Sequence, residues 1–465
     1  MVPKTGPLAN SPVRRYSHIS RKRAQRILTM RLMASADTKK DQVVVIGAGV
    51  AGLNCAANLQ RNGVPVTVVE ASDGVGGRVR TDVQDGFLLD RGFQIFLTSY
   101  PEARLALDYN ALDLKPFYAG ALVRFDGTFQ IVADPFRHLV DGLGSLLNPI
   151  GSPLDKILVG IVRTKNLFRS VEDILGDSNE IRIIDKLKQE GFGDSIIDRF
   201  FRPFLGGIFF DRNLNTTSRL FDFVMKMLAT GENCLPAQGI GSVAEQLASR
   251  LPESSILLNT DVETVDASED GVVINLKNGD SMRAKMAVVA TDGPHAVSIL
   301  GSALNACPST DKSPVGTCCL YFSAPEPPMK GNYLYLDGDN KGSIVNNCCV
   351  PSEVSPSYAP VGKSLVSVSV IGTRDEMSDA ELQTSVLNEL ESWFGKDAVD
   401  SWSHLKTYRI PFAQPNQVPP TNLNRQLKIK KNLYVAGDHR TSATLDGALK
   451  SGRLVAEMIC SDLKQ

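Results

Sequence analysis

Residues 43–52, which read VVVIGAGVAG, decide the fold of this chain. The first four are β-branched, which is typical of a strand buried on both faces of a sheet. Three glycines follow with the spacing G-x-G-x-x-G, and residues 53–59 then read as a helix that Gly63 closes. A second apolar strand is predicted at residues 66–69, with Glu70 at its end. This order of strand, glycine turn, helix and strand predicts a dinucleotide-binding unit.

Each part of this motif has a physical role in binding a dinucleotide. Gly47 permits a tight turn, Gly49 lets the backbone approach a pyrophosphate, and Gly52 lets the helix pack closely against the strand. The helix N-terminus offers unpaired N–H groups and a partial positive charge to the phosphates. Glu70 lies 23 residues after Gly47. It can accept hydrogen bonds from a ribose and would repel a 2′-phosphate, so NADP is disfavoured. The alternative is a glycine-rich turn without a ligand.

A second glycine turn follows the acidic residue. Residues 71–78 read ASDGVGGR. Gly76 and Gly77 can wrap a pyrophosphate, and Arg78 can neutralise its charge. The two glycine turns together predict a ligand that carries a pyrophosphate.

The run from residue 47 to residue 78 resembles the large flavoprotein superfamily of amine oxidases, protoporphyrinogen oxidases and carotenoid desaturases. The resemblance continues through DGF at residues 85–87 and LDRGFQ at residues 89–94, a region that approaches the flavin ring in those families. It implies FAD rather than NAD. The covalent flavin–cysteine motif of monoamine oxidases is absent, so the FAD is expected to be non-covalent. The implied fold is α/β, with a Rossmann-like FAD-binding domain of the p-hydroxybenzoate hydroxylase/amine oxidase type interleaved with a mixed α+β substrate domain.

The C-terminal part of the chain supplies a second block of the same resemblance. Residues 432–436 predict a strand that runs into Gly437 and Asp438, and DGA at residues 446–448 begins a helix. The N-terminus of that helix would suit the electron-rich pyrimidine edge of a reduced flavin. In the superfamily the aspartate that matches Asp438 holds the ribityl or pyrophosphate, while backbone N–H groups near the start of the helix meet the flavin.

Motifs and resemblance together give a set of expected cofactor contacts. They are Gly47, Ala48, Gly49, Ala51, Gly52, Glu70, Ala71, Gly76, Gly77, Arg78, Arg91, Gly92, Phe93, Gln94, Val262, Gly437, Asp438, Asp446, Gly447 and Ala448. No catalytic residue is assigned, because a flavin accepts a hydride equivalent at N5 and the protein mainly orients the donor carbon and excludes water. No metal site is expected, since the eight cysteines form no C-x-x-C pair and the five histidines are scattered.

The domains are expected to interleave along the chain. The FAD-binding domain is predicted from residues 41–120, 235–300 and 428–463, and the substrate domain from residues 121–234 and 301–427. Segment 121–234 reads as mostly helical. Residues 379–394 have helical apolar spacing, and residues 364–371 alternate like a strand.

Subfamily resemblance favours an apolar substrate. Ser323 stands where monoamine oxidases carry a strand lysine, and Thr444 stands where they carry the second tyrosine of an aromatic cage. Carbon–carbon chemistry on a polyene or tetrapyrrole is therefore preferred, and this step is analogy with the family. An amine oxidase-type flavoenzyme and a non-catalytic FAD-binding redox scaffold are the alternatives. His439 could lie near the flavin or be a structural hydrogen-bonding residue.

Two apolar stretches have two interpretations each. Residues 136–168 could form a surface helix that touches a membrane and admits a lipid-soluble substrate, or they could be core helices of the substrate domain. Residues 200–210, FFRPFLGGIFF, resemble the corresponding stretch of plant-type carotenoid desaturases and could be a cavity wall or core. The sequence contains no run of about 18 consecutive apolar residues, so it predicts no transmembrane helix.

The N-terminal segment differs in charge from the rest. The chain has 50 basic and 51 acidic residues, and residues 1–36 hold eight of the basic ones and no acidic one. Basic, serine-containing and acid-free composition predicts an organelle transit peptide of a plant-type organellar protein, with plastid preferred and mitochondrion second. A disordered basic arm is the alternative. The remaining body has a net charge of −9, so no nucleic-acid partner is expected. The cysteines are expected to be structural thiols in a reduced compartment.

Overall fold

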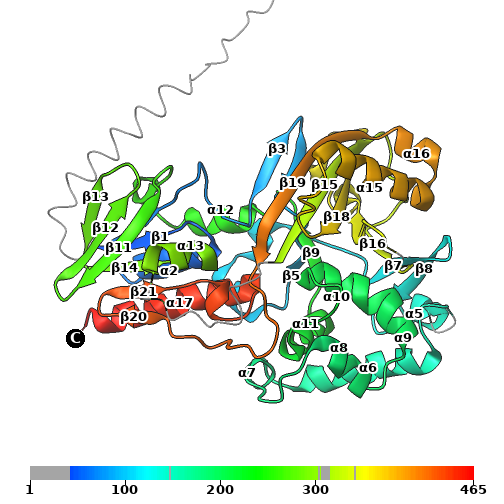
Figure 1. Ribbon diagram of the computed structural model, residues 1–465, viewed down its shortest axis with the longest axis horizontal. Helices are drawn as coiled ribbons and strands as arrows, with labels where there is room; N and C mark the ends of the chain where they lie inside the picture. Colours follow the sequence, from blue (N-terminus) through cyan, green and yellow to red (C-terminus); the bar gives the residue numbers. More distant parts are fainter. Residues whose placement is uncertain (1–41, 146–147, 302–303, 305–314, 340–341, 465) are drawn as a thin grey trace, which may run out of the picture.

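The computed structural model describes residues 42–464, except for 146–147, 302–303, 305–314 and 340–341. The predicted transit peptide therefore lies outside the described residues. A six-stranded sheet with the order β10-β2-β1-β14-β21-β20 forms the middle of one half of the molecule (Figure 1). Five strands are parallel and β20 is antiparallel. The strands are β1 (Val43–Ile46), β2 (Val66–Val69), β10 (Ile256–Leu257), β14 (Met286–Val289), β20 (Lys428–Lys430) and β21 (Leu433–Val435).

Both faces of this sheet are covered, as the buried β-branched strands require. Helix α2 (Val50–Arg61) and helix α17 (Leu445–Asp462) pack together on one face, where a Cβ on Gly452 would lie 2.2 Å from the carbonyl oxygen of Ala51. The other face packs against a three-stranded sheet and α13, through one apolar cluster. These elements are β11 (Val262–Ser268), β12 (Gly271–Leu276), β13 (Ser281–Ala284) and α13 (Gly293–Leu300). Segments far apart in sequence thus build one α/β unit.

The other half of the molecule contains a seven-stranded sheet with the order β19-β15-β18-β17-β16-β7-β8. Helix α15 (Asp379–Phe394) buries Leu382, Val386 and Leu390 against it. Helix α15 and strand β18 coincide with the segments predicted from periodicity. The strands are β7 (Gly120–Phe125), β8 (Thr128–Ala133), β15 (Val315–Ala324), β16 (Leu334–Asp337), β17 (Asn347–Cys349), β18 (Ser364–Ile371) and β19 (Ser403–Gln414).

The start of segment 121–234 differs from the helical prediction. Strands β7 and β8 form an antiparallel hairpin there, and its turn residues Asp126 and Gly127 have φ values of 49° and 75°. An Asp-Gly pair is a strong hairpin signal, because both residues tolerate positive φ. Most of the remaining described residues of the segment are helical, as predicted, and helix α6 packs against α11. The helices are α5 (Leu139–Ser145), α6 (Pro153–Phe168), α7 (Val171–Leu175), α8 (Ile183–Gln189), α9 (Asp194–Ile196), α10 (Arg202–Phe209) and α11 (Ser218–Thr230).

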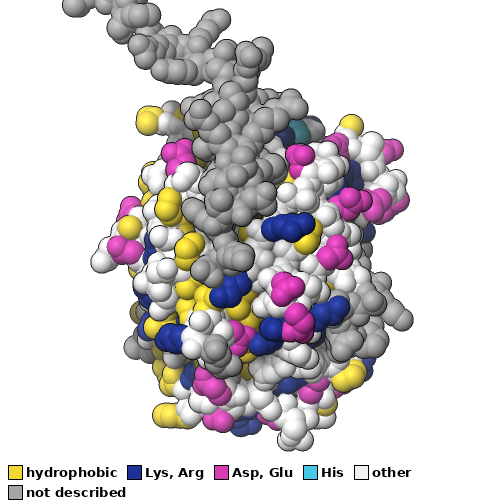
Figure 2. Space-filling model, turned by 90° about the vertical axis from the view of Figure 1, so that its left-hand side faces the viewer, with side chains coloured by type: hydrophobic (Ala, Val, Ile, Leu, Met, Phe, Trp, Pro, Cys, Tyr) yellow, Lys and Arg dark blue, Asp and Glu magenta, His cyan; other side chains and the backbone are white. Residues whose placement is uncertain are grey.

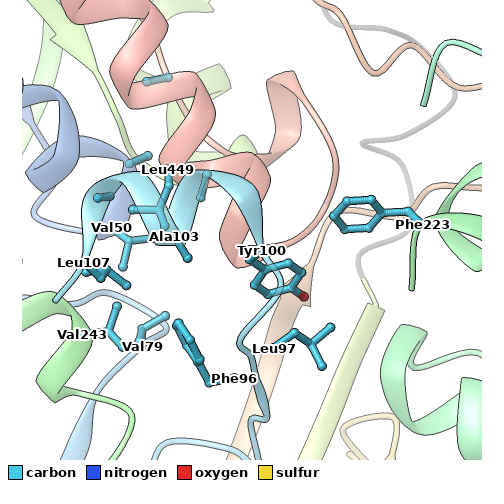
Figure 3. Close-up of a cluster of buried hydrophobic side chains, with 14 of the residues drawn as sticks. Val50, Val79, Phe96, Leu97, Tyr100, Ala103, Leu107, Phe223, Val243 and Leu449 are labelled. Atoms are coloured by element: carbon cyan, nitrogen blue, oxygen red, sulfur yellow. The ribbon is translucent and has the colours of Figure 1, made fainter. Parts of the chain in front are cut away.

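One apolar core joins the α/β unit to these helices. Figure 3 shows Tyr100, at the start of α3, facing Phe223 of α11, and the two rings stack with centroids 5.9 Å apart. Val50 of α2 and Leu449 of α17 belong to the same cluster. The remaining elements connect the halves. They are β3 (Thr81–Gln84), β4 (Phe87–Asp90), β5 (Phe96–Leu97), α3 (Pro101–Ala106), α4 (Tyr109–Leu112), β6 (Leu114–Pro116), β9 (Asn233–Pro236), α12 (Ser242–Ala248), α14 (Pro351–Val354) and α16 (Lys396–Asp400).

Within the described residues, no helix is long and apolar enough to cross a membrane. The described cysteines are unpaired, and all except Cys460 are buried. Burial raises the pKa of the Cys319 thiol to about 11. This accords with the prediction of structural thiols. Cys307 lies outside the described residues.

Candidate cofactor and active site

A cavity of about 1130 Å³ lies at the carboxyl ends of the parallel strands, where ligands bind in open α/β sheets. It extends between the α/β unit and the seven-stranded sheet, and residues from both line it. Most of the predicted cofactor contacts are brought together there. Those that line it are Gly47, Gly49, Ala51, Glu70, Ala71, Gly76, Gly77, Arg78, Arg91, Gly92, Phe93, Gln94, Val262, Gly437, Asp438 and Ala448.

Ala48 and Gly52 lie beside the cavity and shape it without lining it. The N–H of Ala48 donates to Oε2 of Glu70 at 2.7 Å. A Cβ on Gly52 would lie 2.0 Å from the carbonyl oxygen of Gly47, so only glycine lets α2 approach the turn. Both residues therefore act on the cavity through the backbone.

Asp446 and Gly447 also lie outside the cavity lining, in the first turn of α17. The carboxylate of Asp446 accepts hydrogen bonds from the N–H groups of Glu102 (2.7 Å) and Ala103 (3.3 Å) in α3. Burial raises the pKa of this carboxyl group to about 6. A Cβ on Gly447 would lie 2.1 Å from the carbonyl oxygen of Ser442. These two residues hold the N-terminus of α17 in place beside the cavity.

The two glycine turns meet at the N-terminus of α2. Gly49 and Gly76 form a parallel β-bridge, and Gly49 is the N-cap of α2, without a capping side chain. A Cβ on Gly49 would have no protein atom within 4 Å. Gly47 has a φ of 104°, and a Cβ there would lie 2.8 Å from the carbonyl oxygen of Ala290. The open space before the uncapped helix end fits a pyrophosphate, which would accept hydrogen bonds from free N–H groups.

Glu70 and Val262, the two residues expected to meet a nucleoside, both line the cavity. Oε1 of Glu70 accepts hydrogen bonds from the N–H (2.9 Å) and the hydroxyl (2.7 Å) of Ser72, which hold the carboxylate at the end of β2. Oε2 accepts only the hydrogen bond from the N–H of Ala48, so it retains a lone pair for a ribose hydroxyl. Val262 begins β11 where the pairing with β12 shifts register, between residues 262 and 264. The irregular backbone at this bulge faces the cavity, so it can offer polar groups to an adenine.

Arg78 and Asp438 form an ion pair that joins the two ends of the chain. The guanidinium donates two hydrogen bonds of 2.8 Å to the carboxylate and one of 3.0 Å to the carbonyl oxygen of Ala413. It also lies 5.3 Å from the centroid of the Phe412 ring. Asp438 is buried. The motifs predict separate ligand roles for the two side chains, whereas in the structure the two bind each other.

The segment 91–94 is held by partners on two sides. Arg91 donates to both oxygens of Asp82 at 2.8–3.1 Å, and the hydroxyl of Tyr408 donates to the same carboxylate at 2.7 Å. Nε2 of Gln94 donates to the carbonyl oxygen of Arg78 at 2.7 Å. The side chains of Arg91 and Gln94 are thus largely committed to shaping the cavity wall.

Asp90 is a positioning residue that the sequence analysis did not single out. Its buried carboxylate accepts hydrogen bonds from the hydroxyl of Thr81 (2.6 Å), the N–H of Ile240 (3.0 Å) and the hydroxyl of Tyr358 (2.9 Å). Burial raises its pKa to about 6. It anchors the segment that begins at Arg91. The only sequence signal was its place within LDRGFQ.

Strand β19 is the second feature that was missed. Several of its residues line the cavity although the strand carries no motif, among them Lys406, Tyr408, Ile410 and Gln414. Strand β19 is an edge strand that pairs with β15 and crosses above Gly92, where a Cβ would lie 2.6 Å from the side chain of Ile410. Only the sheet topology places it there.

Three residues discussed in the sequence analysis have different outcomes. Ser323 does not line the cavity, whereas Thr444 does and also caps α17, accepting a hydrogen bond from the N–H of Gly447 at 2.9 Å. His439 is buried behind Gly437, and neither ring nitrogen has a hydrogen-bond partner among the described residues. Burial lowers its pKa to about 4. His439 is therefore a buried side chain in its neutral form that makes no hydrogen bond to the described residues.

One arm of the cavity has apolar walls. From the aromatic stretch 200–210, Phe204, Phe209 and Phe210 line the cavity, while Phe201 is buried in the core. None of the described lining residues is a cysteine. The other apolar wall residues come from several elements and are Phe93, Ile95, Leu97, Ile208, Val224, Leu228, Leu334 and Leu336. Among the described residues, no group of three or more histidine, cysteine and acidic side chains could hold a metal ion.

Comparison with known proteins identifies the family of the chain. The family described as "Flavin containing amine oxidoreductase" matches residues 50–460. An L-amino acid dehydrogenase of Synechocystis is 25% identical over 387 residues, which are 77% of this chain and 79% of that protein. Protoporphyrinogen oxidase 2 of Arabidopsis thaliana, described as chloroplastic/mitochondrial, is 26% identical over 175 residues. These cover 36% of this chain and only about a third (32%) of that relative.

A solved structure shares the fold. The cyclohexylamine oxidase of Brevibacterium oxydans has a TM-score of 0.65 and 17% sequence identity, covering 92% of this chain and all of that one. At this identity the likeness establishes the architecture. The predicted fold class is confirmed.

Proposed function

We propose that this chain, which belongs to the family of flavin-containing amine oxidoreductases, oxidises an extended and largely apolar molecule such as a polyene or a tetrapyrrole. It is an FAD-dependent oxidoreductase. The apolar arm of the cavity is the observation that carries the proposed substrate class. Aromatic and aliphatic side chains of α10, α11 and β16 form its walls, and such walls bind apolar molecules by removing their surface from water.

Bound FAD supplies a hydride acceptor, and the chain's residues position it and its partner. The backbone at Gly49 leaves room for the pyrophosphate, and Oε2 of Glu70 can accept a hydrogen bond from the ribose. The N-terminus of α17, which Thr444 caps, presents the positive end of a helix dipole to the cavity. Phe204 and its apolar neighbours exclude water from the reacting carbon.

Charge in the apolar arm also argues for this substrate class. The side chains that define this arm are all apolar, and Asp82, one of the six acidic residues that line the whole cavity, is already bound by Arg91 and Tyr408. A protonated amine would lose its hydration there without gaining a carboxylate partner, which is costly. Amine oxidation is nevertheless the second candidate function, because the Synechocystis relative that covers most of the chain is an L-amino acid dehydrogenase.

An anaerobic reduction assay separates these functions. Purified FAD-loaded protein is mixed with a porphyrinogen, a carotene precursor, a polyamine or an L-amino acid, and the loss of flavin absorbance near 450 nm is followed in the absence of an acceptor. We expect reduction by an apolar compound and not by the amines. If only the amines reduced the bound flavin, the function of the protein would be amine oxidation. A bound flavin that no compound reduces would indicate a redox scaffold.

The non-covalent state of the FAD is tested by denaturation. We expect the yellow chromophore to stay in solution when the protein is precipitated, because no described cysteine lines the cavity. A chromophore that remains in the pellet would contradict the proposal.

We also propose that the protein is a plant-type organellar enzyme that acts in a plastid, with the mitochondrion second. Support comes from the basic, acid-free composition of residues 1–36 and from the organellar description of the Arabidopsis relative. Fluorescence microscopy of plant cells that express residues 1–36 fused to a fluorescent protein tests this location. A diffuse cytosolic signal would contradict it.

Peripheral membrane contact is proposed for helix α6. Leu154, Ile157, Ile161 and Phe168 lie on one face of this helix and are 44–83% exposed. Helix α6 packs on α11, whose Leu228 lines the apolar arm, so the exposed face lies one helix away from the cavity. Such a face can bury its apolar side chains at a bilayer surface.

Sedimentation with phosphatidylcholine vesicles tests the membrane contact. We expect Ile157→Asp to weaken binding at least fivefold, because the charge would have to enter the apolar region. The matched control is Leu105→Asp on α3, where a leucine that is 71% exposed lies outside this face. Equal effects of the two variants would argue against α6 as the contact.

A further inference from the structure

A second, smaller cavity adjoins the first. It has a volume of about 190 Å³. Four residues line both cavities, so the two cavities adjoin along a shared boundary; they are Phe209, Phe210, Gln414 and Ala443. Ala443 directly precedes Thr444, the N-cap of α17, and the second cavity therefore reaches the same helix N-terminus that the first one does.

The second cavity runs from the surface inward. Its outer residues are partly exposed, namely Asp211, Asn215 and Val418. Phe209 and Ala443, at the boundary that the two cavities share, are buried. Gln417, which lines the second cavity, binds the loop before α17. Its side chain accepts a hydrogen bond from the N–H of Ala443 (3.1 Å) and donates one to the carbonyl oxygen of Thr441 (3.3 Å). One lining residue of the second cavity, which we call the passage, is thus hydrogen-bonded to the loop that leads into α17.

The boundary that the two cavities share contains a residue with an uncommon backbone conformation. Phe210 ends α10 in the left-handed conformation, with φ 54° and ψ 31°. Only glycine and asparagine adopt this region readily, so the conformation costs roughly 1 kcal/mol for a phenylalanine. Gln414 holds this corner by donating to the carbonyl oxygen of Ile208 at 3.1 Å. These contacts fix the end of α10 at the place where the two cavities adjoin.

We propose that the second cavity is the access route of dioxygen to the reduced flavin and the exit route of hydrogen peroxide. A cavity of about 150 Å³ holds a ligand as small as benzene, so this one accepts dioxygen and excludes an extended polyene or tetrapyrrole. Reduced FAD transfers two electrons and two protons to dioxygen, which gives oxidised FAD and hydrogen peroxide. The route rests on the FAD-dependent activity and is needed because an extended molecule in the apolar arm would block the first cavity.

The polar side of the passage suits the product. Asp211, Asn215 and Thr216 contribute carboxylate, amide and hydroxyl groups to its lining. Hydrogen peroxide is small and forms hydrogen bonds as donor and acceptor, so a polar passage can conduct it to solvent. The apolar side, with Leu220, Val315 and Val418, offers dioxygen a favourable surface.

Reoxidation after photoreduction tests the route without any organic substrate. The bound flavin is reduced by light with EDTA and then mixed with dioxygen in a stopped-flow instrument. We expect Val418→Trp, which fills the passage, to slow reoxidation at least tenfold, and Val418→Ala, which leaves it open, to have no effect. Leu228→Trp narrows the apolar arm and so tests the rival route through the first cavity; we expect it to slow reoxidation less than Val418→Trp does. An unchanged rate in Val418→Trp, or slowing in Leu228→Trp alone, would overturn the proposal.

A second measurement does not depend on the flavin. In apoprotein with ¹³C-labelled methyl groups, dissolved dioxygen is paramagnetic and should enhance the relaxation of the Leu220 and Val315 methyl signals. We expect this enhancement to disappear in Val418→Trp. Wild-type methyl groups without any enhancement would also overturn the route. Because neither experiment uses the organic substrate, failure of the route is distinguishable from failure of the proposed substrate class.

Discussion

Gly49 and Gly52 are both glycines of α2 and its cap, yet the cavity requires them for different reasons. A Cβ on Gly49 meets no protein atom, and its φ of −71° is open to any residue. We expect Gly49→Val to leave the melting temperature of the apoprotein nearly unchanged while abolishing FAD retention, because the side chain occupies the space for the pyrophosphate. Visible absorbance of the purified variant and its thermal unfolding measure the two effects.

Gly52→Ala is the matched control. Its Cβ would lie 2.0 Å from the carbonyl oxygen of Gly47 and 3.2 Å from the Cβ of Ala290. Overpacking of this kind typically costs about 1–3 kcal/mol. We expect this variant to lose stability even without FAD. If Gly49→Val retained FAD at wild-type stability, the pyrophosphate would have to bind elsewhere.

His439 makes the stability of the protein depend on pH. Its folded-state pKa of about 4 lies below the ordinary value of 6.5, so the unfolded chain binds a proton that the folded chain excludes between these pH values. The free energy of unfolding should therefore fall as the pH is lowered from about 6.5 to 4, by on the order of 3 kcal/mol. Above pH 6.5 this contribution is fully present.

Denaturant unfolding of wild type and His439→Phe at pH 7 and pH 4.5 measures this contribution. Asp90 and Asp446 act in the opposite direction, because their raised pKa values make the folded chain bind more protons between about pH 4 and 6. Only the difference between the two proteins isolates His439. A difference that stays the same at both pH values would show that the imidazole is not buried in its neutral form.

The N-terminus of α17 is the element that links the cofactor cavity to the fold. Its cap is Thr444, which lines the cavity. We expect Thr444→Ala to cost about 1 kcal/mol of unfolding free energy and to weaken FAD binding several-fold, with both effects largely absent in Thr444→Ser. Ser378→Ala removes the cap of α15, away from the cavity, and should cost similar stability without changing FAD affinity. Loss of FAD affinity in Ser378→Ala would mean that the effect of Thr444 is general destabilisation.

For the whole molecule, ion pairs between distant segments join the chain ends. Arg78 pairs with Asp438 in the cavity, and Arg453 of α17 pairs with Glu102 of α3 outside it, with Nε–Oε2 and Nη2–Oε1 distances of 2.8 and 2.6 Å. Lysine cannot make the two-pronged contact of arginine. We expect Arg78→Lys to weaken FAD binding about tenfold, or about 1.4 kcal/mol. Arg453→Lys should lower only the melting temperature. Fluorescence titration of the two apoprotein variants with FAD measures their affinities. Equal affinities would show that the Arg78–Asp438 pair does not contribute to FAD binding.

Local sequence predicted the elements around the glycine motifs well. Strands β1 and β2, helix α2 and the start of α17 lie at the predicted positions, because β-branched runs and glycine spacing determine backbone conformation over a few residues. The hairpin at β7 and β8 was missed although its Asp-Gly turn is local, since the apolar residues that follow dominated the helical interpretation.

The sequence by itself predicted a dinucleotide site at a strand–glycine–helix turn, and resemblance extended the expected ligand to FAD. Only the tertiary structure decided that Arg78 meets Asp438, 360 residues away, that β19 crosses above Gly92, and that two cavities meet at Phe210 and Ala443. The physical reason is that a glycine turn depends on backbone sterics within a few residues. Charge pairing, edge-strand placement and cavity walls depend instead on how segments distant in the chain pack together.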